Sequence, residues 1–210
     1  MGRTLIALLA LGLAPAPASA CFNEMEIELR QEAVKTARAE RLMRSGHLRR
    51  AFRVAGRTLR DLERNTDASP GRALHLGNRL RRVVAVSAVR LHGAVDRRRW
   101  RTPGHVSADA RREHLDWAVT TLERLARSDD PIDQARYAEA LDQVGRHQEA
   151  VTILTRLAED DVMPDAYGYA ALSRSQDALG RTALRDRARR ACEAMTRREQ
   201  RGICPSFPAS

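Results

Sequence analysis

Apolar residues recur at the spacing of an α-helix along most of the chain, whereas the strict alternation typical of a β-strand is nearly absent. Glycine, proline and capping residues divide the pattern into eight predicted helices, which makes the fold class all-α. The stretch from Val83 to Val89 is the most apolar, and we expect it to be the most buried. The helices are expected over residues 24–44, 47–64, 70–93, 107–127, 131–145, 147–159, 165–179 and 182–200.

The segment from Ala94 to Val106 interrupts this pattern. It holds the basic run Arg97-Arg-Arg-Trp-Arg and then Pro103-Gly104, which disfavour a regular helix. We therefore expect an exposed loop inserted within the second helix pair. Ser107 is the expected N-cap of the helix that follows, and Asp130-Pro131 is the expected start of the next one.

A short pattern occurs twice, about a hundred residues apart. Gly46 precedes Ala51, and Gly145 precedes Ala150, each time after an apolar helical stretch. A glycine just past one helix and a small residue in the first turn of the next describe two antiparallel helices packed closely together. Their recurrence predicts stacked helix pairs, about four in number, over residues 24–64, 70–127, 131–160 and 165–200.

The first twenty residues are typical of a secretory signal peptide. Arg3 precedes an apolar run that is too short to span a membrane, and Ala18-Ser-Ala20 forms a cleavage site. The segment resembles the lipobox of bacterial lipoproteins, in which the next residue, here Cys21, receives lipid. Ala18 stands where that family favours leucine, so ordinary cleavage is the alternative. Either way the mature chain is expected to be exported, in the periplasm or anchored in the bacterial envelope by lipid on Cys21.

The two other cysteines, Cys192 and Cys204, are predicted to form a disulfide in an oxidising compartment. Such a bond would hold residues 201–210, the expected C-terminal tail, over the last helix. No histidine or cysteine spacing typical of a metal site accompanies them, and no metal or other cofactor is expected.

The formal net charge is +10, which favours anionic partners in general. However, Lys35 is the only lysine, and the excess of arginine is typical of a GC-rich genome rather than of a binding patch. Aromatic residues make up only 4% of the chain, so a stacking surface for single-stranded nucleic acid is not expected, and export argues against genomic DNA. Anionic polymers or membrane surfaces stay open as alternative partners.

The helix pairs resemble tetratricopeptide repeats. The resemblance rests on Ala39, Leu42, Gly46, Ala51 and Phe52 in the first unit and on the matching residues Ala138, Leu141, Gly145, Ala150 and Val151 in the third. In the fourth unit Gly180 matches, but Arg185 stands where alanine is expected. In the second unit Gly93 is the candidate turn, and Leu115 and Ala118 match only if the Ala94–Val106 loop is left out. The alternative is an irregular helical bundle.

The resemblance implies a short solenoid over residues 21–200 whose first helices line a groove for a peptide or protein segment. The protein would then be a non-catalytic interaction scaffold. Catalysis finds no support, because the six histidines are dispersed and no nucleophile motif or phosphate-binding loop is present. The groove positions, expected to point outward, are Glu40, Arg44, Arg90, Glu139, Asp142, Gln143, Arg174 and Asp177.

Overall fold

The computed structural model describes residues 20–64, 70–127, 129–196 and 202–207, which form eight α-helices and no β-strand. This confirms the all-α prediction. The helices are α1 (Ala20–Arg44), α2 (Leu48–Arg64), α3 (Pro70–Arg90), α4 (Ala108–Leu125), α5 (Pro131–Gln143), α6 (His147–Glu159), α7 (Ala166–Ala178) and α8 (Thr182–Met195).

Side-chain caps fix the starts of three helices. Ser107, Asp130 and Asp165 have extended backbones, and their side chains accept hydrogen bonds from backbone N–H groups in the first turns of α4, α5 and α7. Each bond satisfies a donor that has no partner inside its helix. Pro131, which lacks an N–H, occupies the first position of α5. The expected starts of α4 and α5 are thereby confirmed.

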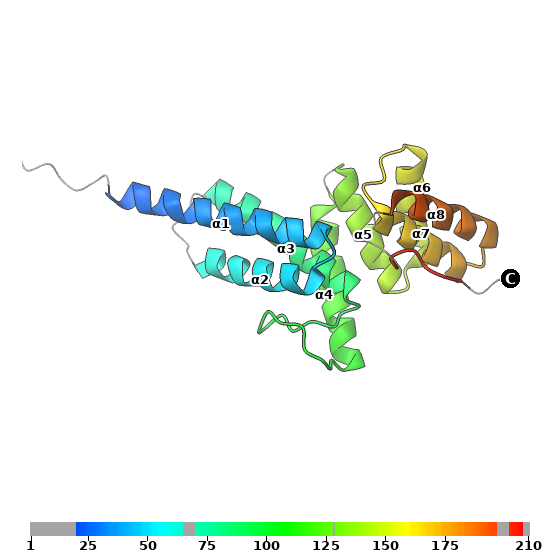
Figure 1. Ribbon diagram of the computed structural model, residues 1–210, viewed down its shortest axis with the longest axis horizontal. Helices are drawn as coiled ribbons and strands as arrows, with labels where there is room; N and C mark the ends of the chain where they lie inside the picture. Colours follow the sequence, from blue (N-terminus) through cyan, green and yellow to red (C-terminus); the bar gives the residue numbers. More distant parts are fainter. Residues whose placement is uncertain (1–19, 65–69, 128, 197–201, 208–210) are drawn as a thin grey trace, which may run out of the picture.

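The helices form an elongated array in which α1, α2 and α3 lie at one end and α6, α7 and α8 at the other (Figure 1). Each helix packs against the next one in the chain. The first helices of successive pairs also contact one another, α1 with α3, α3 with α5, and α5 with α7. The second helices do not: no Cα atom of α6 lies within 8 Å of one in α8.

A single apolar core runs through most of this array. Ala51 and Ala150, the small residues of the repeated pattern, are fully buried where their helices meet the preceding ones, and so are Ala39 and Ala138. The stretch from Val83 to Val89 in α3 is buried at every position, as expected, because α3 contacts α1, α2, α4 and α5. Small residues at these contacts let the helices approach closely.

The turns within the pairs share one geometry, with one displacement. Gly46, Gly145 and Gly180 all have positive φ, and the next N–H donates to a carbonyl five residues earlier, as in a Schellman turn. After α3 the corresponding bond runs from the N–H of Gly93 to the carbonyl of Ala88 at 2.9 Å. The residue before this donor, with a left-handed backbone, is His92, whose φ is 51°. The turn of the second pair is therefore displaced by one residue.

The segment between α3 and α4 is docked on the protein, which corrects the expectation of an exposed loop. Val95 is buried, and the Trp100 ring packs against Phe52 of α2 with 5.8 Å between centroids. Trp100 fits there because Gly56 has no side chain: a Cβ on Gly56 would overlap the indole ring. The basic run contributes to the docking, since Arg97 stacks on the ring of Trp117 in α4.

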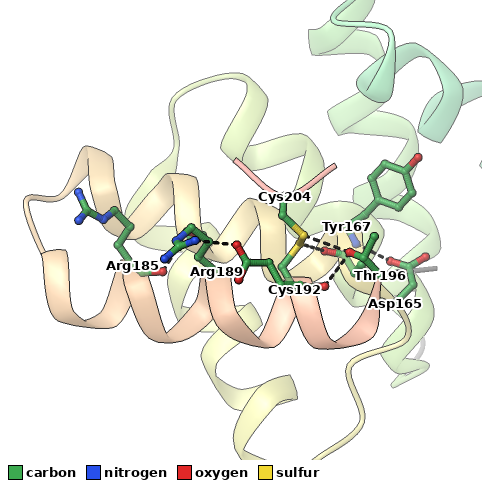
Figure 2. The surroundings of a disulfide bond; sticks show 10 residues. Asp165, Tyr167, Arg185, Arg189, Cys192, Thr196 and Cys204 are labelled. Carbon is green, nitrogen blue, oxygen red and sulfur yellow. Dashed lines mark hydrogen bonds and ion pairs between the residues drawn. A yellow bond between two sulfur atoms is a disulfide. The ribbon is translucent and has the colours of Figure 1, made fainter. Parts of the chain in front are cut away.

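A disulfide joins Cys192 of α8 to Cys204 in the tail, the two cysteines that the sequence analysis paired (Figure 2). The bond packs against Ala166 and Ala170 of α7. The helix α8 ends at Met195 rather than near Gln200. At Thr196 the backbone is extended, and the Thr196 hydroxyl donates to the Cys192 carbonyl at 2.7 Å.

The expected signal peptide lies outside the described residues except for Ala20, and so does the side chain of Cys21. Within the part of the chain that the structure describes, no helix is long and apolar enough to cross a membrane.

Candidate binding groove

The first helices are joined to one another by ion pairs. Between α1 and α3, Arg79 donates to both carboxylate oxygens of Glu40 at 2.7 and 2.6 Å. Burial alone would raise the pKa of Glu40, but the contact with Arg79 outweighs it and lowers that pKa. Between α3 and α5, Arg82 makes the same two-pronged contact with the buried carboxylate of Asp133.

A cluster of charges lies where α3, α5 and the start of α7 meet. Arg90 donates twice to Glu139, both at 3.0 Å, and stacks on the ring of Tyr167 with its guanidinium carbon 3.4 Å from the centroid. Arg136 donates to Glu139 and to both oxygens of Asp165. The four charged side chains thus alternate in sign and hold three helices together.

Burial and neighbouring charges shift the pKa values of Arg136 and Asp165 in opposite directions. Burial disfavours the charged form of Arg136, but the nearby carboxylates of Glu139 and Asp165 prevail and raise its pKa. Burial likewise disfavours the ionised form of Asp165, yet Arg136 and Arg90 lower its pKa. Both groups therefore stay charged at neutral pH, and the cluster is a set of true ion pairs.

The carboxylate of Asp142 links α5 to α7 in a similar way. It accepts hydrogen bonds from Arg174 at 2.8 Å and from the Ser175 hydroxyl at 2.8 Å, and the His147 ring lies 3.4 Å away. Since the side chain of Asp142 is only 2% exposed, these contacts replace the water that it loses.

Three of the expected groove positions therefore do not point outward. Glu139 and Asp142 are buried, and the Arg90 side chain is only 5% exposed, because each pairs with a charge on a neighbouring first helix. Glu40 is half-buried in the same manner. Asp177 contacts Arg185 of α8 at 3.2 Å instead of a neighbouring first helix.

The remaining expected positions are more accessible. Arg44 is exposed at the end of α1, and the side chain of Arg174 is 37% exposed. Gln143 is half-buried, and its side-chain oxygen lies 2.7 Å from Nδ1 of His92. Of these, Arg174 contacts the buried carboxylate of Asp142, and Gln143 follows Asp142 in the chain.

A cleft of about 240 Å³ brings several of the expected residues together. Its walls come from α3, α5 and α7, with Leu48 at the start of α2, and Gly202 and Ile203 of the disulfide-bonded tail form one edge. The expected residues that line it are Arg90, Glu139, Gln143 and Arg174, and the sequence analysis did not anticipate the other polar ones, His92 and Tyr167.

Four partner charges were not predicted from the sequence: Arg79, Arg82, Arg136 and Asp165. A signal for α5 exists: Asp133, Arg136, Glu139 and Asp142 follow one another at intervals of three residues. On a helix this spacing places successive members side by side, in a row that winds around about half of the helix and so faces two neighbouring helices. A charged stripe on a helix that is otherwise rich in alanine indicates pairing with neighbouring helices.

The described residues contain no group of three or more histidine, cysteine, aspartate or glutamate side chains arranged to hold a metal ion. The groove is a set of paired charges with hydrogen-bonding groups at its margin. Comparison with known proteins gives no relative: the chain matches no protein-family model, no curated protein and no solved structure.

Proposed function

We propose that the protein is an exported, non-catalytic interaction scaffold of the bacterial envelope that binds a peptide or protein segment along its first helices. The cleft lined by α3, α5 and α7 is the observation that carries this proposal, because three successive first helices contribute to it. Peptide recognition by helical repeats uses surfaces of this kind, which extend across neighbouring units.

The tetratricopeptide-like solenoid belongs to the same proposal. Four helix pairs with similar turns, buried alanines where the helices meet, and contacts between successive first helices are the features that support it. The displaced turn after α3 and the docked segment at Trp100 make the second pair the most divergent unit.

The chemistry around the cleft favours a polar, extended segment over a strongly charged polymer. Its ion pairs balance, since Arg90, Arg136 and Arg174 face Glu139, Asp142 and Asp165. These bonds hold the lining side chains of Arg90, Glu139 and Arg174 in place before a ligand arrives, which reduces the entropy lost on binding. Beyond their contacts with His92 and Asp142, the Gln143 amide and the Arg174 guanidinium keep N–H donors suited to a peptide backbone.

Affinity capture from envelope extract tests this function. We expect a Gln143→Trp variant, which fills the cleft, to lose a partner that the unaltered protein retains. A Thr120→Trp variant is the control, because Thr120 is exposed on α4, outside the cleft. Equal capture by all three proteins would contradict a binding site in this cleft, provided that circular dichroism shows all three to be folded.

The alternative function is binding of an anionic polymer or membrane surface, which the net charge of +10 favours. Ionic strength separates the two functions. Binding to a polyanion weakens steeply as salt increases, whereas a hydrogen-bonded peptide in a partly buried cleft is affected less. Retention of the captured partner at high salt supports the peptide groove, and complete release by moderate salt supports the alternative.

Export and anchoring rest on residues 1–20 and Cys21. Intact-mass measurement of the protein from its native membrane fraction tests both. A mature chain that begins at Cys21 and carries the added mass of acyl groups is the expected result for an anchored protein. An unmodified Cys21 contradicts the anchor alone, and an uncleaved chain contradicts export through this signal.

A further inference from the structure

A second and larger cleft, of about 620 Å³, lies on the side of the molecule formed by the last two second helices. It opens between α6 and α8, and α7 forms its floor. Apolar residues from all three helices line it, among them Val151, Ala158, Tyr169, Leu172, Leu184 and Ala188. This volume is in the range of ligand-binding pockets in proteins.

The cleft exists because α6 and α8 both pack on α7 but not on each other. At the other end of the array, the segment between α3 and α4 packs on the second helices α2 and α4. There the segment after α3 places Trp100 against Phe52 and Gly56 of α2, and its Arg97 stacks on Trp117 of α4. The tail lies on α8 through Cys204 and Phe207, but among the described residues no segment lines the cleft between α6 and α8 as Trp100 and Arg97 cover α2 and α4.

The rim of the cleft is positively charged. Arg156, Arg181 and Arg187 line it, against a single carboxylate, Glu159. In the described part of the chain none of these arginines forms an ion pair: Arg156 donates to Gln134, and Arg181 donates to Gln148 at 3.1 Å. The acidic groups of a bound ligand could therefore form ion pairs with these arginines, while its apolar groups contact the apolar residues of the cleft.

We propose that this cleft binds an acidic segment of a partner protein that inserts an aromatic side chain between α6 and α8. The aromatic ring would contact Leu172, Leu184 and Ala188, as Trp100 contacts Phe52 and Gly56 within the chain. Its acidic neighbours would pair with the rim arginines. This surface is separate from the cleft on the first helices, because the two share no lining residue.

A synthetic peptide with one tryptophan flanked by aspartate and glutamate residues tests the proposal against the full-length mature protein, by fluorescence anisotropy. We expect saturable binding that is lost when alanine replaces the tryptophan or lysine replaces the acidic residues. The Arg187→Glu and Leu184→Asp variants should each raise the dissociation constant at least about tenfold, through charge repulsion and loss of an apolar wall.

Matched controls separate this effect from damage to the fold. Arg187 and Leu184 are exposed, so their replacement removes no core contact. The controls are Arg124→Glu and Leu74→Asp, which change an exposed arginine and an exposed leucine elsewhere, and both should bind the peptide as the unaltered protein does.

Several results would overturn the proposal: no saturable binding, equal weakening in the control variants, or no weakening in the cleft variants. Displacement of the peptide by dodecanoate at the same site, with tighter binding of dodecanoate, would identify an anionic amphiphile as the occupant and overturn the peptide assignment. Because the Gln143→Trp variant leaves this cleft unchanged, it should still bind the peptide, so failure here is distinguishable from failure of the first-helix groove.

Discussion

The carboxylate of Asp165 both caps α7 and forms ion pairs, and one substitution separates the two roles. Its Oδ1 accepts a hydrogen bond from the Tyr167 N–H at 3.1 Å and caps α7, and its two oxygens also pair with Arg136. Asparagine caps a helix about as well as aspartate but carries no charge. The Asp165→Asn variant should therefore keep the cap and lose the ion pairs.

The structure sets the size of the loss. Removing one partner of a fully buried ion pair costs about 3–5 kcal/mol. The Asp165 side chain is 25% exposed and Arg136 retains Glu139, so the expected loss in unfolding free energy is lower, about 2–3 kcal/mol. The matched control is Asp130→Asn. Asp130 caps α5 through the Ile132 N–H at 2.9 Å and forms no ion pair with a described residue, so it should lose less than about 1 kcal/mol.

The stability lost in Asp165→Asn should also depend on pH, and it should become smaller in acid. Arg136 and Arg90 lower the pKa of Asp165 in the folded protein. The stabilisation from its ionised form is therefore complete above the unfolded pKa, near 3.8, and is lost as the pH falls through the lower folded pKa. The gap between the unaltered protein and Asp165→Asn should be constant near neutral pH and should close in acid below that range.

Urea unfolding followed by far-ultraviolet circular dichroism measures these differences, because the midpoint shifts with stability while the slope stays constant. Equal midpoints for Asp165→Asn and Asp130→Asn would show that the charge cluster does not hold α5 and α7 together. A gap that widens in acid would contradict the assignment of an ionised Asp165.

Two further substitutions test the packing. Gly56→Ala should displace Trp100 and destabilise the fold by about 1–3 kcal/mol, with a change in tryptophan fluorescence. Gly71→Ala, whose added carbon would meet nothing within 4 Å, should leave thermal stability unchanged or raised; equal effects would refute the docking of Trp100. Reduction with dithiothreitol should lower stability by about 3 kcal/mol, by opening the bond between Cys192 and Cys204. A Cys204→Ser variant should not respond to dithiothreitol, and if it responds as strongly, the disulfide is not the cause.

Local signals in the sequence predicted most of the architecture. Turn glycines, N-caps and apolar periodicity depend on residues a few positions apart, so the eight helices and the starts at Ser107 and Asp130 followed directly. The burial of Ala51 and Ala150 followed from the same pattern. The end of α8 did not, because apolar periodicity does not show that the backbone becomes extended at Thr196.

Features that depend on contacts between residues far apart in the sequence were not predicted. Trp100 docks only because Gly56, far away in the sequence, leaves room for its ring. The groove positions were expected to point outward from the register that the turn glycines set, yet Glu139 is buried once Arg90 and Arg136 reach it from two helices. A charged residue at a helix position does not reveal whether its partner is water or an arginine on the next helix.

The central claim is that a partner segment binds along the first helices, and site-specific photo-crosslinking tests it most directly. A photoreactive diazirine derivative of lysine would replace Gln143 in the cleft or, as control, Thr120 on α4, in cells that produce the protein from its own signal. Its slender, flexible side chain leaves the cleft open, unlike the ring of Gln143→Trp. We predict a discrete crosslinked product from position 143 and none from position 120. Products of equal yield from both positions, or a product from position 120 alone, would contradict the account.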